Sequence, residues 1–143
     1  MPNNELSYKD YPDGTRAYFR DDVARGGLSD LNTVVDITNQ ASIDTTKVNE
    51  FKAYTIGKLL YISLQVNKNA TDQSTVVSGL PNILGISSGY GVLSMFFMNG
   101  VDANTNATCV LANGATSARI EFRCGSNPTG NSGMNFSGMF IMR

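Results

Sequence analysis

The sequence predicts an all-β fold, an antiparallel β-sandwich or jelly roll, because short strand-like runs fill it and turn residues separate them. About seven such runs follow residue 45, and none has the length and 3.6-residue period of a convincing helix. The clearest is LLYISLQV at 59–66, where four apolar residues alternate with polar ones, the period expected of a half-buried strand.

Each run is bounded by residues that favour turns. EFKAYTIGKLLYISLQVN at 50–67 breaks at Ile56-Gly57-Lys58, which predicts a β-hairpin. STVVSGLPN at 74–82 is a strand stopped by Gly79-Leu80-Pro81, and GYGVLSMFFMNG at 89–100 ends at Asn99-Gly100. TNATCVLANGATSARIEFRC at 105–124 and MNFSGMFIMR at 134–143 supply the remaining strands.

Charge separates the N-terminal part of the chain from the rest. Residues 1–44 carry eight of the acidic and four of the basic side chains, whereas Asp102 is the only charge between Asp72 and Arg119. We therefore predict an attachment arm or short stalk at 1–45 and a β-sandwich head at 46–143.

The arm holds a turn at Pro12 to Gly14 and a break at Gly26-Gly27. A helical spacing follows at Leu28, Leu31, Val35 and Thr38. A short extended arm with one turn of helix and a partly helical stalk both remain open.

Composition excludes several classes of function. The chain has no histidine, so it cannot form a Ser-His-Asp triad, a Cys-His pair or an HExxH zinc site. Its net charge of −1 and pI of about 5.2 provide no basic stripe for nucleic acid or an anionic membrane. The first ten residues have neither the basic nor the apolar region of a signal peptide, and no apolar run approaches a membrane span. We expect no catalysis, cofactor, signal peptide or membrane insertion.

Two cysteines, Cys109 and Cys124, flank an Asn-Gly pair that favours a type I′ hairpin turn. With that turn at Asn113-Gly114, counting along the strands places Cys109 opposite Ala118. Cys124 then lies roughly 20 Å beyond this position on the same face, at ~3.3 Å per residue, which is too far for a disulfide. Both cysteines are therefore expected to be reduced core residues; an intermolecular bridge and a reactive thiol are the alternatives.

Three other patterns offer little chemistry. Asp102 to Asn106 begins like a calcium loop, but Ala107 and Asn113 replace the required glycine and glutamate. GSNPTGNSG at 125–133 lacks the Gly-Lys-Ser/Thr ending of a phosphate-binding loop. Glu121 lies between Arg119 and Arg123, which predicts a solvated face or an ion pair between subunits. No metal site is expected.

The last strand is apolar on both faces. Met134, Phe136, Phe140 and Met142 share one face, and Met139 and Ile141 lie on the other. This pattern indicates burial against a neighbouring subunit, or else a central strand covered on both faces within one chain.

FKAYTIGKLLYISLQVN, VVSGLP, the Asn-Gly hairpin and the terminal MNFSGMFIMR together resemble the C-terminal head domains of bacteriophage tail-fibre and baseplate proteins of the receptor-binding type. The resemblance covers residues 48–143. It implies a homotrimeric head on the virion surface, made in the host cytoplasm, attached to other virion proteins through residues 1–45 and able to bind a host-surface saccharide or protein. The absence of tryptophan and the shortness of the N-terminal part depart from that family.

Three functions remain open: a trimeric receptor-binding appendage, a capsid decoration or head-fibre protein that only stabilises the particle, and a bacterial saccharide-binding module. Aromatic faces and fixed amides suit sugars. The candidate saccharide-binding residues are Tyr54, Tyr61, Tyr90, Asp102, Asn104 and Asn106. The candidate trimer-interface residues are Phe136, Met139, Phe140, Ile141 and Met142.

Overall fold

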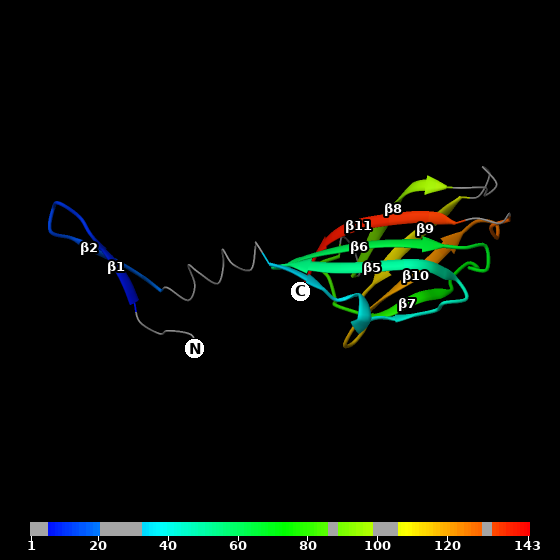
Figure 1. Ribbon diagram of the computed structural model, residues 1–143, viewed down its shortest axis with the longest axis horizontal. Coiled ribbons are helices and arrows are strands. Elements are labelled where there is room, and N and C mark those ends of the chain that lie inside the picture. Colours follow the sequence, from blue (N-terminus) through cyan, green and yellow to red (C-terminus); the bar gives the residue numbers. More distant parts are fainter. Residues whose placement is uncertain (1–5, 21–32, 86–88, 99–105, 130–132) are drawn as a thin grey trace.

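The computed structural model describes residues 6–20, 33–85, 89–98, 106–129 and 133–143. These residues form a two-stranded hairpin and a separate nine-stranded sheet, and every pair of neighbouring strands is antiparallel (Figure 1). The prediction of an all-β antiparallel fold is confirmed. The large sheet has the strand order β3-β5-β6-β11-β8-β9-β10-β7-β4.

The elements in chain order are β1 (Leu6–Asp10), β2 (Arg16–Arg20), β3 (Val34–Asp36), the 3₁₀ turn η1 (Thr38–Gln40), β4 (Ser42–Ile43), β5 (Val48–Ile56), β6 (Leu59–Val66), β7 (Thr75–Leu80), β8 (Tyr90–Met98), β9 (Ala107–Ala112), β10 (Ala118–Cys124) and β11 (Met134–Ile141). The predicted break at Ile56-Gly57-Lys58 is the β5–β6 turn, and Gly57 has a φ of 56° there. The four apolar residues of the 59–66 alternation, Leu60, Ile62, Leu64 and Val66, are all buried.

The N-terminal segment 6–20 forms a β-hairpin. The predicted turn around Pro12 reverses the chain, with Gly14 at a φ of 85°. The Asp13 carboxylate accepts hydrogen bonds from the backbone N–H and the hydroxyl of Thr15, at 2.9 and 2.6 Å. Arg16 pairs with Asp10 at 2.6 Å across the strand ends. A local turn with its own side-chain bonds therefore pairs β1 with β2.

The large sheet starts at Val34, before the expected boundary at residue 46. Val35 lies in strand β3, so the helical spacing expected from Leu28 to Thr38 is not followed there; Leu28 and Leu31 lie outside the described residues. After β3, the backbone N–H of Ile37 bonds to Ala53 of β5 and that of Asp44 bonds to Val76 of β7. The segment 37–44 thus crosses from one edge of the curled sheet to the other.

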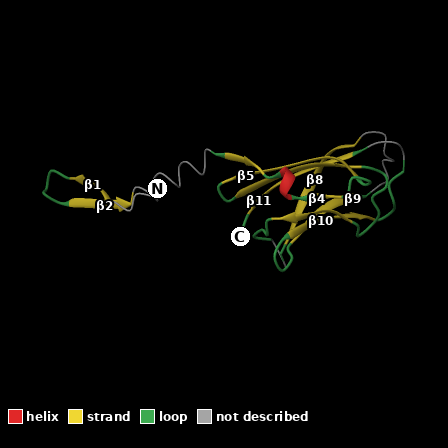
Figure 2. Ribbon diagram, turned by 60° about the horizontal axis from the view of Figure 1, so that its bottom comes forward, coloured by secondary structure: helices red, strands yellow, loops and turns green. Residues whose placement is uncertain are grey.

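The sheet curls because β8 belongs to both of its halves. Tyr90 to Leu93 pair with β9, whereas the second half of β8 pairs with β11. The two halves enclose one core, and Figure 2 shows the strands of both halves from a second direction. Phe122 of β10 and Phe136 of β11 meet across it edge to face, with ring centroids 6.4 Å apart.

The predicted type I′ turn at Asn113-Gly114 is wrong. Neither residue has a positive φ, and Ala112 pairs with Arg119 instead of Ala115. The Asn113 side chain binds another loop instead: Nδ2 donates to the Ile83 carbonyl at 2.7 Å, and the Ile83 N–H donates to Oδ1 at 2.8 Å. Asn82 makes the same reciprocal pair with the backbone of Gly114. We call these four bonds the Asn82–Asn113 clasp.

The corrected register changes the position of the cysteines. Cys109 faces Phe122 and Cys124 faces Ala107, so the cysteines are diagonal neighbours on adjacent strands rather than roughly 20 Å apart. Such diagonal positions are about 7–8 Å apart at Cα, at or beyond the limit for a disulfide. Both are free thiols; Cys109 is fully buried, as predicted, and Cys124 is half-buried.

We expect a maleimide reagent at neutral pH to label Cys124 slowly and Cys109 only after unfolding. Burial raises the pKa of the Cys109 thiol, and burial together with Asp72 raises that of Cys124, so little thiolate is present at either residue. Mass spectrometry of the labelled native protein checks this expectation. Rapid double labelling, or a disulfide between the two residues, would contradict it.

Candidate functional site

The outer face of β3, β5, β6 and β11 carries exposed apolar side chains in register. Val34, Ile56, Leu59 and Ile141 are successive cross-strand partners. Leu84 extends this line, since its N–H donates to the Ile141 carbonyl at 2.7 Å. Val34 is 60%, Ile141 51% and Leu84 61% exposed, while Ile56 and Leu59 are half-buried. We call these five residues the apolar row.

The apolar row lies at one end of the sheet, which we call the proximal end. The chain enters the sheet there at Val34, turns between β5 and β6 at Gly57-Lys58, and finishes at Arg143 after β11 (Figure 1). The opposite, distal end carries the connections at 44–47 and 67–74.

The next row on the same face contains two of the predicted saccharide-binding residues. Tyr54, Tyr61 and Met139 are cross-strand partners, and the tyrosine rings are stacked with centroids 6.5 Å apart and planes 20° apart. Met139 is 61% exposed. The fold therefore places predicted saccharide-binding residues and predicted interface residues side by side on one surface.

The other predicted saccharide-binding residues do not join them. Tyr90 is exposed at the start of β8 and pairs with β9. Asn106 is exposed just before β9, at the distal end. Asp102 and Asn104 lie outside the described residues. The four of these six residues that the structure describes therefore do not lie together at one site.

The five predicted interface residues divide by the alternation of β11. Phe136 is fully buried in the chain's own core, and Phe140 and Met142 pack against that core. Their side chains point inward, and those of Phe140 and Met142 are half-buried. Of the five predicted interface residues, Met139 and Ile141 face outward and are exposed to solvent.

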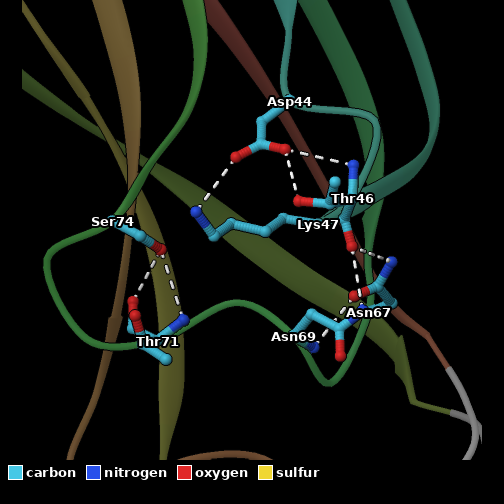
Figure 3. Close-up of polar contacts among 7 residues, drawn as sticks. All are labelled: Asp44, Thr46, Lys47, Asn67, Asn69, Thr71 and Ser74. Atoms are coloured by element: carbon cyan, nitrogen blue, oxygen red, sulfur yellow. Dashed lines mark hydrogen bonds and ion pairs between the residues drawn. The ribbon is translucent and has the colours of Figure 1, made fainter.

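Polar side chains gather at the distal end, around the turn before β5 (Figure 3). Asp44 accepts hydrogen bonds from the Thr46 hydroxyl at 2.6 Å and from Lys47 at 3.0 Å. Thr46 in turn offers its backbone oxygen to the side-chain amides of Asn67 and Asn69, at 3.2 and 3.0 Å. The bonds from Thr46 and then Lys47 hold the pKa of Asp44 below its usual value.

From Asn67, a chain of side-chain amides crosses the outer face. Asn67 Nδ2 donates to Asn49 Oδ1 at 2.9 Å, Asn49 Nδ2 donates to Gln65 Oε1 at 3.0 Å, and Gln65 Nε2 donates to Asn135 Oδ1 at 3.2 Å. We call these four side chains the amide chain. Sequence alternation indicates that Gln65 and Asn135 face outward, but Asn49 joins them through a bulge between Val48 and Glu50, for which the sequence carries no signal.

Glu121 on β10 is buried between two arginines. Its carboxylate oxygens accept hydrogen bonds from Arg119 Nε at 2.8 Å and from Arg123 Nη2 at 2.6 Å, so the trio forms ion pairs within the subunit. Burial opposes ionisation of Glu121, but the two arginines outweigh it and hold its pKa below the ordinary value.

We expect Glu121→Gln to remove part of the pH dependence of stability. Because the folded-state pKa is lowered, the glutamate stabilises the fold fully above its unfolded pKa, which is near 4.5, and loses this contribution as the pH falls through the folded value. The wild type should therefore progressively lose its advantage over Glu121→Gln as the pH falls below about 4.5. Urea titrations of both proteins across this range measure it, and a constant difference would contradict it.

The residues that the structure describes offer few other candidate sites. They contain no cluster of three or more potential metal ligands, and no helix long and apolar enough to cross a membrane. A shallow hollow of about 170 Å³ lies between Ser42–Asp44 and Thr75–Ser78 at the β4–β7 edge, and it is open to solvent.

Searches of family models, curated proteins and solved structures found no match to this chain.

Proposed function

We propose that this chain is a bacteriophage virion structural protein: a homotrimeric tail or baseplate fibre-type appendage whose sandwich-like head contacts a host-surface receptor. The observation that carries the proposal is the exposed apolar row, with Ile141, Val34 and Leu84 each at least half exposed. Monomeric proteins rarely leave adjacent large aliphatic side chains of this kind in water, because covering them is favourable by about 25 cal/mol per Å².

The position of the apolar row favours a second copy of the chain as its cover. The segment from the N-terminal hairpin enters the sheet at Val34, which belongs to the row. Copies that associate through this end would therefore bring their arms together, as an attachment stalk requires. The three-fold number and the virion location rest on the resemblance of residues 48–143 to phage tail-fibre and baseplate heads.

The distal end then faces away from the assembly and is available to a receptor. The described polar groups there include amides, hydroxyls and paired charges. A surface of this composition suits a hydrated partner such as a saccharide.

Two measurements test the proposal together: the mass of the protein in solution, and its adsorption to host envelopes and to virions lacking it. A trimer that adsorbs to envelopes supports it. A trimer that binds only virions supports the capsid decoration or head-fibre alternative, and a monomer that binds saccharide supports the bacterial binding module.

Deletion of residues 1–30 should leave the head folded and abolish incorporation into virions, because the large sheet starts at Val34. Circular dichroism melting and a virion reconstitution assay measure the two effects separately. Unfolding of the truncated chain would show that the hairpin β1–β2 is part of the head's stability.

A further inference from the structure

The amide chain is organised before any ligand arrives. Each of its members is held by the next, from Asn67 through Asn49 and Gln65 to Asn135. Gly133 contributes as well, because a Cβ at this position would overlap the Gln65 side chain. Side chains fixed in this way lose little conformational entropy on binding, which is the main cost of recognition by flexible polar groups.

The amide chain retains donors and acceptors on the surface that are not used in its internal hydrogen bonds. A carboxamide offers two donors and two acceptor lone pairs. Asn49 and Gln65 each use one N–H donor within the amide chain. The Nδ2 group of Asn135, the last member of the amide chain, has no hydrogen-bond partner among the described residues. Asn49 is exposed, and Gln65 and Asn135 are half-buried on the outward face. The array therefore presents alternating donors and acceptors to solvent.

The array carries no charge. All four members are neutral amides, and Lys47, at the same turn, is paired with Asp44 at 3.0 Å. The exposed Glu50 is the cross-strand partner of Gln65, and the exposed Lys52 lies one row further along β5. A phosphate, sulfate or carboxylate would meet the Glu50 carboxylate and no cation within the array, whereas hydroxyl groups can donate to a carboxylate and can both donate to and accept from carboxamides. The chemistry that fits is a neutral polyhydroxylated molecule.

We propose that the amide chain of Asn49, Gln65, Asn67 and Asn135 is a binding site for a neutral saccharide. This site differs from the predicted one: it lies two rows beyond Tyr61 along β6, separated from the tyrosine pair by the row of Lys52, Ser63 and Ser137. The inference rests on the proposed function only for the source of the saccharide, the host surface.

An array of immobilised neutral oligosaccharides, with sialylated and phosphorylated counterparts, tests the site on the full-length protein. We expect binding to one or more neutral members and a loss of about 10-fold or more in Asn49→Ala and in Asn135→Ala, since one hydrogen bond contributes about 1.4 kcal/mol. Gly133→Ala should weaken binding as well, without removing any amide.

The matched control is Asn39→Ala, which removes an exposed amide on η1, outside the array, and should leave binding unchanged. Melting curves of the same samples identify any variant that fails to fold. If Asn135→Ala fails to fold, Asn49→Ala still tests the site, because Asn49 is exposed and lies in a bulge. Binding only to anionic members, binding only to protein-coated control spots, no binding at all, or equal binding by wild type and Asn49→Ala would overturn the inference.

Saccharide binding is measured separately from trimer formation and incorporation into virions. Loss of saccharide binding in variants that remain trimeric and enter virions would locate the receptor site. A trimer that enters virions but binds no saccharide would leave the structural role in place while rejecting the site.

Discussion

Asn113→Ala should lower the free energy of unfolding by about 2–6 kcal/mol. The substitution removes both hydrogen bonds to Ile83, which is fully buried, and leaves the N–H and carbonyl of Ile83 without partners. Each buried backbone group left unsatisfied costs about 1–3 kcal/mol. Urea unfolding followed by circular dichroism measures the change.

A variant with aspartate at position 113 distinguishes the contributions of the two hydrogen bonds to Ile83. Asn113→Asp keeps an acceptor for the Ile83 N–H but replaces the donor to its carbonyl with a carboxylate oxygen, so it should also be destabilising at neutral pH and recover in part when the aspartate is protonated. Asn127→Ala, which changes an exposed loop amide, should alter stability by no more than about 0.5 kcal/mol. Equal stability of Asn113→Ala and the wild type would mean that the Asn82–Asn113 clasp does not hold the two loops together.

Ile141→Asp should dissociate the proposed trimer and leave the subunit folded. Ile141 is half exposed in the subunit and lies within the apolar row, between Leu59 and Leu84. A carboxylate at this position stays solvated in a monomer but would be buried without a partner in the assembly, at a cost of several kcal/mol. We therefore expect association to weaken by at least about 100-fold, measured by sedimentation equilibrium over a range of concentrations.

Ser137→Asp is the matched control. It introduces the same charge on the same face of β11, but four residues away from the apolar row, beside Ser63 and Ser94. Its association should remain close to that of the wild type. If both variants dissociated equally, the interface would extend over the whole outer face; if neither did, the apolar row would not be the interface.

Strands were predictable where both their pattern and their turns are local. The alternation of β6 and the Gly57 turn follow from residues a few positions apart, and the burial of Leu60, Ile62, Leu64 and Val66 agrees with them. The inward and outward faces of β11 were also predicted, since an eight-residue strand keeps its period of two regardless of its neighbours.

The clasp shows why local turn signals can fail. Asn113-Gly114 favours a tight turn by itself, yet the Asn113 amide binds the backbone of Ile83, 30 residues earlier in the chain. Tertiary bonds of this kind outweigh a turn preference and shift the register of β9 against β10, and the inferred cysteine separation failed with it. The short strand β3 was missed because its three residues owe their conformation to pairing with β5.

The candidate sites depended on which strands lie side by side. The sequence singled out Tyr54, Tyr61, Met139 and Ile141 separately, but only the β5–β6–β11 pairing places them on one face. The amide chain needed both this pairing and the bulge at Asn49 to align its members, and no local pattern encodes the bulge.

The most direct test of the account is the molar mass of the intact protein in dilute solution, measured by light scattering coupled to size-exclusion chromatography. The account predicts three times the 15.4 kDa mass of the chain, reduced to the single-chain mass by Ile141→Asp. A wild-type protein that remains at the single-chain mass at all accessible concentrations would contradict the proposal that other copies cover the apolar row.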